Sequence, residues 1–475
     1  MPAKLSASQW SILAVTALVL IVFWSSRMTE SPITWDAAEN LRLTLNLERS
    51  GVISLSTTAP LQPSMYREPL PLFYGQFAVR AVDQALGRAD DAEYYRGVRA
   101  KLLKYQNIPW LLLLSVAVFL MGRELGLAFT SSWLCVLLTN LLLLQTDTGY
   151  FMLDNLYTEA AAAALLCSGS LLLLAGVRRT RSTLIALAGV CFGLLTLVKA
   201  SYLYIVLGTV IAIPLLAPLL RRSLGASTRY AAVLAAVTLL VTLPWAFRNY
   251  VELGYFAIAQ RGGEALYQRA VLDQLSWDEY RGAFYHYAPY PLSGALRRLL
   301  GYSRRDSDQG GRMQRLNVSS TSSFYVRDYS ADIAGRPQDA VTYLHLAGAQ
   351  RVQLRNQLAA AGNPQPEVES DRQVQARALA IIRQHPLRHL AVILTCLWYE
   401  AFFSFPALVF ILVYAFRRRN FELAVLVLPA FASLLFYASL AYPEPRYGIP
   451  THPVIICALL ALAFQYRQRF KAGAV

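Results

Sequence analysis

Long apolar runs alternate with short polar connections from one end of the sequence to the other. We count ten runs of about 16 to 20 residues, close to the length that crosses a hydrocarbon core of roughly 30 Å. Each run predicts a membrane-spanning helix. The predicted spans are Trp10–Trp24, Gln106–Met121, Phe129–Leu144, Thr158–Val177, Thr183–Val198, Tyr202–Leu219, Tyr230–Phe247, Trp398–Phe416, Glu422–Leu440 and Tyr447–Phe464.

Two longer polar segments break this pattern, at roughly residues 25–105 and 248–387. The sequence therefore predicts an all-α polytopic membrane protein in three parts: a membrane module over residues 1–247, an extramembrane domain over 248–387, and three C-terminal spans within 388–475. Inside the domain, the Gly-, Ser- and charge-rich stretch Ser303–Ser323 is expected to be a mobile loop. The stretch Gln357–Pro386 indicates a helix end, a Pro-rich turn and a second helix.

The distribution of charge predicts how the chain is oriented in the membrane. Hydrophobic residues make up 56% of the chain and charged residues 15%, with a net charge of +15. Arginines gather in four short segments, around residues 178–181, 221–229, 417–419 and 467–471, and these four all fall on one side of a ten-span count, which marks the cytoplasmic side. Both termini are then inside and both polar segments outside. The basic balance is explained by topology and the lipid bilayer, without a nucleic-acid partner.

The cysteine and histidine patterns indicate neither a disulfide framework nor a zinc site. The five cysteines all lie within apolar runs, where a free Cys behaves as a small hydrophobe, so no disulfide framework is expected. Neither a CxxC nor an HExxH pattern occurs, so the sequence carries no zinc signature.

Acidic residues gather in the predicted outer segments. Asp36 and Glu39, in ITWDAAENLRL, are three residues apart and share one face of a predicted helix. Asp147 and Asp154 precede the fourth span, and Glu159 lies at its outer end. An acid in the first turn of a helix is common because the helix dipole favours it, so Asp36 has a purely structural interpretation beside a chemical one.

Three basic residues are predicted at a similar depth on the outer side. Lys199 ends the fifth span, Arg248 follows the seventh, and Arg446 lies between the last two. A basic side chain near the end of a span reaches water by extending along the helix, which needs no function. Three bases at one level equally suit an anionic partner such as a lipid phosphate.

Several short motifs then occur in an informative order: TWDAAENLRL, YREPLPLFY, LDNLYTE, LTLVKAS, LPWAFRNYVELGYFAIAQRGGEALY and PRYGIPTHPVI. In this order the chain resembles polyprenyl-phosphate-sugar glycosyltransferases of the GT-C class, akin to the bacterial aminoarabinose transferases and the protein O-mannosyltransferases. The resemblance covers most of the membrane region and leaves out residues from about 269 to 386. It implies a GT-C-like fold and an envelope glycosyltransferase without a nucleotide cofactor.

The resemblance also assigns roles to residues. It implies a catalytic acid at Asp36, supported by Glu39, Asp154 and Glu159, and a donor phosphate bound by Lys199, Arg248 and Arg446. Substrate contacts are implied for Tyr66, Gly262, Gly263 and Tyr447. Glu68 matches an acid that helps to hold a metal in the aminoarabinose branch, which leaves a divalent ion as an alternative to a structural role. Two departures stand out: Ala37 follows Asp36 where the family pairs two acids, and Glu68-Pro69-Leu70-Pro71 lacks the usual Lys, His or double proline.

These roles form a coherent reaction. A sugar on a polyprenyl phosphate carries its own leaving group, so an enzyme has to orient an acceptor hydroxyl and stabilise the departing phosphate. Asp36 is expected to accept the hydroxyl proton, and direct attack inverts the anomeric centre. The sugar and the acceptor, whether lipid, glycan or protein, are not specified. We expect an inner (plasma) membrane protein whose active site faces the periplasm or exterior.

Two other functions fit a basic polytopic chain. A lipid-linked sugar flippase or a secondary transporter carries ionisable residues in mid-membrane and related halves, whereas here the acids lie in outer segments and no repeat is found. An O-antigen ligase-like enzyme shares the large outer segment and is expected to hold its key residues there.

Overall fold

The computed structural model describes residues 5–58, 60–145, 149, 152–290 and 292–473. Within these ranges every regular element is helical, as expected from the sequence. The chain divides into two compact units, one formed by residues 1–259, 403–433 and 446–475 and the other by residues 260–402 and 434–445. The functional division at residues 247/248 and 387/388 stays a prediction.

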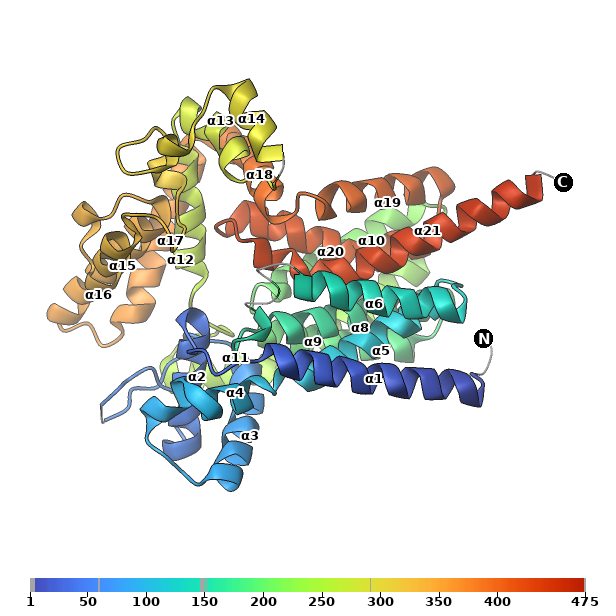
Figure 1. Ribbon diagram of the computed structural model, residues 1–475, viewed down its shortest axis with the longest axis horizontal. Coiled ribbons are helices and arrows are strands. Elements are labelled where there is room, and N and C mark those ends of the chain that lie inside the picture. The colour runs from blue at the N-terminus through green and yellow to red at the C-terminus, as the bar shows by residue number, and fades with distance from the viewer. Residues whose placement is uncertain (1–4, 59, 146–148, 150–151, 291, 474–475) are drawn as a thin grey trace. The chain divides into compact units, whose positions relative to one another are not determined.

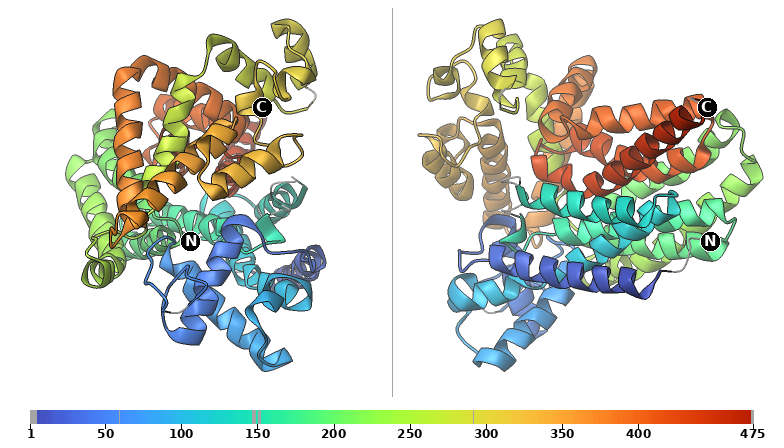
Figure 2. Two further views of the ribbon diagram at one scale, coloured as in Figure 1. Left: turned by 90° about the vertical axis from the view of Figure 1, so that its left-hand side faces the viewer. Right: turned by 45° about the vertical axis from the view of Figure 1, so that its right-hand side comes forward.

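A bundle of long apolar helices dominates the first unit, and its members run side by side (Figures 1 and 2). Helix α8 is its core, since 83% of its most apolar stretch is buried, against 11% for the peripheral α1. The bundle contains α1 (Ala7–Arg27), α5 (Asn107–Glu124), α6 (Phe129–Gln145), α8 (Glu159–Arg178), α9 (Ser182–Val198), α10 (Tyr202–Leu219), α11 (Leu224–Leu253), α19 (Ser404–Arg418), α20 (Phe421–Leu440) and α21 (His452–Gly473).

Seven helices in the described residues are long and apolar enough to cross a membrane, and α6 and α9 are shorter apolar helices. The chain is therefore a multi-pass membrane protein, while the count of ten spans stays a prediction. The expected span Trp398–Phe416 is wrong as one helix, because α18 (Pro386–Glu400) ends before α19 begins at Ser404. Pro406 lies in the first turn of α19, where its missing N–H is tolerated, so the proline is compatible with a new helix starting at Ser404.

Close contacts and buried polar links hold the bundle helices together. A side chain at Gly193 of α9 would meet the Val241 side chain of α11 at 2.6 Å, so this pair of helices needs a glycine there. The Trp24 indole N–H of α1 donates to the Asn140 Oδ1 of α6 at 3.2 Å, and the Asn140 amide donates to the Ser115 hydroxyl of α5 at 3.2 Å. Small residues and interhelical hydrogen bonds are the usual means of packing helices in a membrane.

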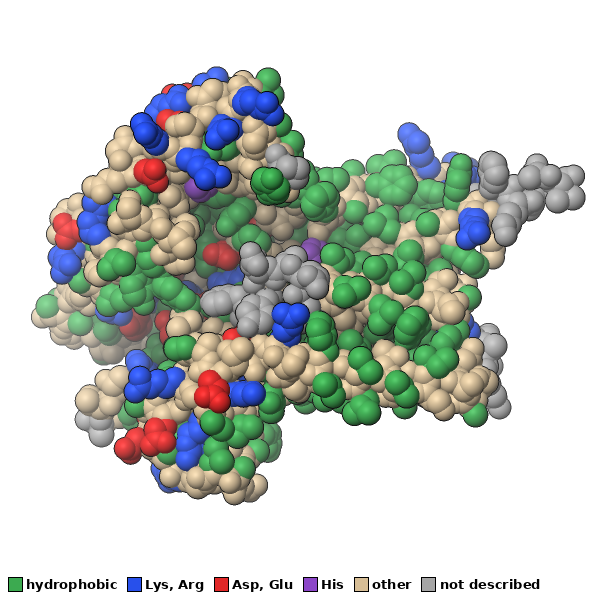
Figure 3. Space-filling view, viewed as in Figure 1, with side chains coloured by type: hydrophobic (Ala, Val, Ile, Leu, Met, Phe, Trp, Pro, Cys, Tyr) green, Lys and Arg blue, Asp and Glu red, His purple; other side chains and the backbone are tan. Residues whose placement is uncertain are grey.

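The first polar segment folds into short helices that belong to the same unit: α2 (Trp35–Ser50), α3 (Pro69–Leu86), the 3-10 turn η1 (Asp91–Tyr95) and α4 (Gly97–Lys104). Helix α2 stops at Gly51, whose φ of 70° suits glycine, and α3 begins with Pro69, whose missing N–H costs nothing in a first turn. Leu43, Ile53 and Leu72 form their apolar core. Figure 3 shows charged side chains over this segment and hydrophobic ones over the bundle.

The second unit is a smaller helical domain with a charged core. Arg269 is completely buried, and its guanidinium bonds to Asp273 at 2.8 Å, while Asp273 also bonds to His389 at 2.8 Å. Buried charges paired in this way fix how α12 packs against α18. The unit contains α12 (Gly262–Val271), α13 (Trp277–His286), α14 (Leu292–Leu300), α15 (Tyr325–Ala334), α16 (Tyr343–Ala360), α17 (Pro366–Gln384) and α18.

The stretch Ser303–Ser323, expected to be a mobile loop, has more structure than its composition indicates. Two 3-10 turns form within it, and the Met313 and Leu316 side chains are completely buried. Arg315 also forms an ion pair with Glu279. Two apolar residues within a polar run are thus enough to dock it on the domain. The helix–turn–helix expected over Gln357–Pro386 is confirmed by the end of α16 and the start of α17.

Candidate active site

The opening residues of α2 carry the first two acids. Asp36 lies in the first turn and Glu39 one turn later, on the same face, as the spacing predicts. The Thr34 side chain, at the N-cap position, makes no capping hydrogen bond. Trp35 has a φ of 57°, which is a strained backbone conformation for a bulky residue. Such strain persists where the surrounding structure imposes it and is concentrated at functional sites.

Arg67 joins the two acids. Its Nη2 lies 2.7 Å from Asp36 Oδ1, and its Nε donates to Glu39 Oε2 at 3.0 Å. The guanidinium also stacks on the Tyr66 ring at 5.5 Å from the ring centre. Sequence reasoning missed Arg67. The available signal was its position directly before Glu68 in the YREPLPLFY motif.

Arg446 binds the other oxygen of Asp36, across 410 residues of sequence. Its Nη2 lies 3.0 Å from Asp36 Oδ2. The Arg446 guanidinium is mostly buried between two aromatic rings, 5.3 Å from the centre of Tyr157 and 5.5 Å from that of Tyr447. Each Asp36 oxygen thus accepts a hydrogen bond from a different arginine. The sequence prediction that Asp36, Arg446 and Tyr447 belong to one site is consistent with this geometry.

Lys199 is the third basic residue of this group and the second on the Tyr447 ring. Its backbone caps the end of α9, and its Nζ lies 5.4 Å from the centre of the Tyr447 ring. The Lys199 ammonium bonds to Glu159 Oε1 at 2.8 Å, and Glu159 is buried at the start of α8. Lys199 and Arg446 therefore lie on one tyrosine, each balanced by one acid.

Glu68 supports the turn that carries Lys199. Its Oε1 accepts a hydrogen bond from the Ala200 backbone N–H at 2.9 Å. In the described residues, no group of three or more His, Cys, Asp or Glu side chains is arranged to hold a metal ion. Among these described residues the hydrogen bond of Glu68 is to the backbone, and a metal at Glu68 stays a prediction.

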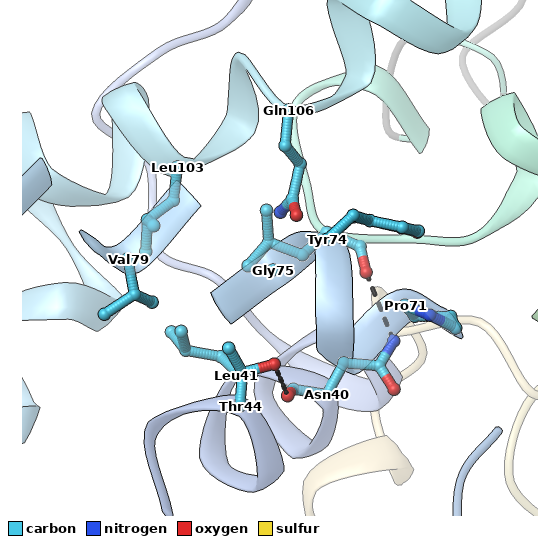
Figure 4. A pocket seen from close by; sticks show the side chains of 10 residues that line it. Asn40, Leu41, Thr44, Pro71, Tyr74, Gly75, Val79, Leu103 and Gln106 are labelled. Atoms are coloured by element: carbon cyan, nitrogen blue, oxygen red, sulfur yellow. Dashed lines mark hydrogen bonds between the residues drawn. The ribbon is translucent and has the colours of Figure 1, made fainter. Parts of the chain in front are cut away.

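Packing between α2 and α3 fixes the base of the site (Figure 4). Gly75 approaches Thr44 so closely that a side chain there would lie 3.0 Å from the Thr44 hydroxyl. Asn40, one turn beyond Asp36, donates to the Leu156 carbonyl at 3.3 Å. Burial, together with the negative charge of Glu159, raises the pKa of Tyr74 well above its usual value, so this phenol stays neutral. The Gly75–Thr44 contact and the Asn40 hydrogen bond thus hold α2 in place behind its first turn.

Asp154 belongs to a separate buried cluster. Its carboxylate accepts hydrogen bonds from the Thr29 backbone and hydroxyl at 2.6 and 2.7 Å, from the Ser31 hydroxyl at 2.7 Å and from the Lys104 ammonium at 3.0 Å. Burial by itself would raise the pKa of Asp154, but these hydrogen bonds outweigh it and lower the pKa. The structure does not bring Asp154 to the Asp36 group. Asp147 lies outside the described residues.

Arg248 is held by its own helix. Its guanidinium forms an ion pair with Glu252, bonds to the Asn249 side chain at 2.9 Å, and stacks on Trp245 at 4.9 Å. These contacts do not include Lys199 or Arg446. A phosphate contact from Arg248 therefore stays a prediction.

Gly262 and Gly263 begin α12 and lie in the second unit. The Gly263 N–H donates to Asp371 at 3.0 Å, and a side chain at Gly263 would collide with the Asp371 carbonyl oxygen. Around Gly262, by contrast, an added side chain would meet nothing within 4 Å. The close approach to Asp371 thus explains the glycine at position 263. A substrate contact from either glycine stays a prediction.

Comparison with solved structures identifies proteins with a similar fold. The archaeal oligosaccharyltransferase AglB from Archaeoglobus fulgidus, solved with an inhibitory peptide and a dolichol-phosphate, matches with a TM-score of 0.50 and 13% identity. The match covers 99% of this chain and 52% of AglB, so this chain spans about half the length of that enzyme. The fold is GT-C-like. At this identity, what the two proteins share is the fold.

A second GT-C protein is similar over most of its length. ArnT from Cupriavidus metallidurans, solved bound to undecaprenyl phosphate, matches with a TM-score of 0.36 and 11% identity, over 96% of this chain and 77% of ArnT. No protein-family model and no curated protein sequence matches this chain. The GT-C-like fold expected from the ordered motifs is confirmed, and the roles of its site residues rest on the geometry described above.

Proposed function

We propose that this chain is a membrane glycosyltransferase that moves a sugar from a polyprenyl-phosphate donor to an envelope acceptor. The observation that carries the proposal is the group around Asp36: a partly exposed carboxylate bonded to Arg446, which shares the Tyr447 ring with Lys199. The group combines a proton acceptor with two cations suited to a phosphate. AglB, which shares the fold, was solved with a lipid phosphate of this class.

Asp36 accepts the proton in the proposed reaction. The acceptor hydroxyl oxygen attacks the anomeric carbon and forms the new glycosidic bond, while the hydroxyl proton passes to the Asp36 carboxylate. The bond from the anomeric carbon to the phosphate oxygen breaks, and its electron pair stays on the phosphate. General-base assistance of this kind contributes roughly 10² to 10⁴ in rate.

Lys199 and Arg446 stabilise the departing phosphate. Their stacking on Tyr447 holds two positive charges close together before substrate arrives, so little reorganisation is needed as negative charge develops. A phosphate that binds Arg446 competes with Asp36 for the same guanidinium. Donor binding would therefore free one Asp36 oxygen for the acceptor proton.

Arg67 positions the acids rather than binding the donor, because its guanidinium is already shared by Asp36 and Glu39. Glu39, the more exposed of the two acids, is then suited to an acceptor or sugar hydroxyl. The arginine-rich connections support a site on the periplasmic or exterior side of the inner membrane. No step is assigned to a metal ion.

The test compares purified wild-type protein with Asp36→Asn in liposomes that contain polyprenyl-phosphate sugars extracted from the host. The readouts are release of free polyprenyl phosphate and the mass of the glycosylated product. Wild type should release the lipid phosphate, and Asp36→Asn should bind donor but release it at least 100-fold more slowly. Mass spectrometry of host glycolipids and glycans, with and without the gene, identifies the sugar.

Two outcomes would reject the proposal. Movement of intact donor across the liposome membrane, without cleavage, would instead indicate a flippase. Cleavage of a diphosphate-linked glycan in preference to a monophosphate-linked sugar would indicate a ligase-like enzyme.

A further inference from the structure

The first unit contains a second basic feature, an open pocket of about 690 Å³ at the other end of α10. Helix α10 begins three residues after Lys199 and ends at Leu219, so the pocket lies roughly 27 Å along the bundle from the candidate active site. The ends of α10 and α19, the start of α20 and a residue of α21 line it. We name it the basic pocket after its charged lining residues, Arg221, Arg222, Arg418, Arg419 and Glu422.

The basic pocket has an excess of positive charge. Four arginines line it together with one glutamate, and Glu422 is already shared by Arg178 at 3.0 Å and Arg222 at 3.9 Å. Within the described part of the chain, Arg221, Arg418 and Arg419 form no ion pair with an acid. Three guanidiniums facing one pocket repel one another unless an anion is present, so the lining favours an anionic ligand.

Backbone conformation is a separate feature of two of these arginines. Arg221 has a φ of 57° and Arg419 a φ of 52°, a region in which glycine or asparagine is normally found at helix ends. Both turns would close more easily with glycine. Neighbouring arginines at positions 222, 417 and 418 already supply the positive charge that topology requires. Thr180 has a similar φ of 53° at another helix end, so these angles belong to the helix ends, and the case for an anion rests on the four arginines that line the pocket.

The surroundings indicate the class of anion. Leu215 and Leu219 on the last turns of α10 are about two-thirds exposed, and Phe416 at the end of α19 is also exposed. These apolar side chains belong to a surface that faces lipid chains in a membrane protein. Arginine forks match phosphate oxygens. A phosphate joined to acyl chains can contact both the arginines and the exposed apolar side chains. A free phosphate can contact the arginines alone.

We propose that the basic pocket binds the headgroup of an anionic glycerophospholipid of the cytoplasmic leaflet. The phosphate accepts hydrogen bonds from Arg221 and Arg419, and the acyl chains lie along α10 and α19. Basic pockets between helices on the cytoplasmic side are suited to such headgroups. The bound lipid adds to the Arg222–Glu422 contact in tying α10 to α20, and it joins both to the end of α19.

The test uses the full-length protein in a neutral detergent after lipid removal. The variant is Arg221→Gly with Arg419→Gly, because glycine relieves the strained φ angles and should preserve folding. The matched control is Arg181→Gln with Arg417→Gln, which removes two exposed arginines of the same side that do not line the pocket. Binding is measured by native mass spectrometry and by thermal shift with phosphatidylglycerol, phosphatidylcholine and inorganic phosphate.

Phosphatidylglycerol should bind and stabilise the wild type and the control alike, and bind the glycine variant at least tenfold more weakly. Phosphatidylcholine and inorganic phosphate should give no shift at the same concentration. If the control lost phosphatidylglycerol binding to the same extent, the effect would come from general surface charge, and the proposal would be overturned. Equal binding of inorganic phosphate would also overturn it, in favour of a soluble anion.

Discussion

Two acid–base clusters of the first unit have similar compositions, but their carboxylates differ in exposure and in the groups that they bind. The Asp154 carboxylate is 9% exposed and accepts four hydrogen bonds, from Thr29, Ser31 and the completely buried Lys104. The Asp36 carboxylate is 22% exposed, and each of its oxygens bonds to a separate arginine. Both acids were candidates for the same site.

We propose that this difference separates a structural acid from a chemical one. The Asp154 carboxylate accepts four hydrogen bonds from groups of the fold, so we expect it to be unavailable to a substrate. One of the two arginines that hold Asp36, Arg446, is a cation for which a phosphate can compete, and Asp36 lies at a strained and partly exposed helix start. A carboxylate with exchangeable partners at an accessible position is suited to proton transfer. The following variants test this distinction.

The largest effect is expected for Asp36→Asn. Loss of the proton acceptor should lower the transfer rate by 10² or more, measured as release of polyprenyl phosphate in liposomes. Asparagine has the same shape as aspartate and Asp36 is partly exposed, so the fall in melting temperature should be smaller than for a buried acid. If Asp36 only favours the helix dipole, transfer would stay within about threefold of wild type, and the chemical interpretation of the cluster would fail.

Lys104→Met should instead act on stability. Removing the ammonium leaves Asp154 buried without its cation, and breaking a buried pair costs about 3 to 5 kcal/mol. We expect a clear fall in melting temperature in detergent, with the transfer rate per folded molecule retained. Lys101→Met, a half-exposed lysine one turn earlier on α4, is the control and should be nearly silent. A normal melting temperature with lost transfer would place Asp154 in the active site.

Arg446→Gln should weaken donor binding by about 10- to 100-fold, the value of a hydrogen bond to a charged group. Binding of a labelled polyprenyl phosphate to purified protein measures the effect. Lys199→Gln should show a loss of similar size, because both cations lie on the Tyr447 ring. Arg248→Gln tests the third predicted contact. Unchanged binding in the first two variants would remove the phosphate site from the Asp36 cluster.

The smallest effect is expected at Glu68. Glu68→Gln keeps an oxygen for the Ala200 N–H and should transfer sugar at close to the wild-type rate, while Glu68→Ala should lose about two- to tenfold, the value of one hydrogen bond. Transfer assays with and without EDTA make the comparison. A metal ligand would behave differently, since Glu68→Gln would then abolish a chelator-sensitive activity.

Sequence patterns predicted well wherever a short stretch of chain suffices. Asp36 and Glu39 lie on one helix face, Lys199 ends its helix, and α16 and α17 meet at a Pro-rich turn, because periodicity, capping and proline act over a few residues. The order of the motifs also identified the fold. The break between α18 and α19 was missed because the run Trp398–Phe416 is apolar on both sides of it.

Tertiary structure alone decided which charges meet. Arg67 reaches Asp36 across 31 residues and Arg446 across 410, while the similar acid Asp154 takes Lys104 instead. Composition cannot rank these partners, because every acid and base in the outer segments has the same local character. In the same way, the sequence predicted that the arginines of the short connections share one side of the membrane, and only the tertiary structure brought four of them to one pocket at the ends of α10 and α19 and the start of α20. The physical reason is that pairing depends on the three-dimensional positions of helix ends, which packing of the whole bundle sets.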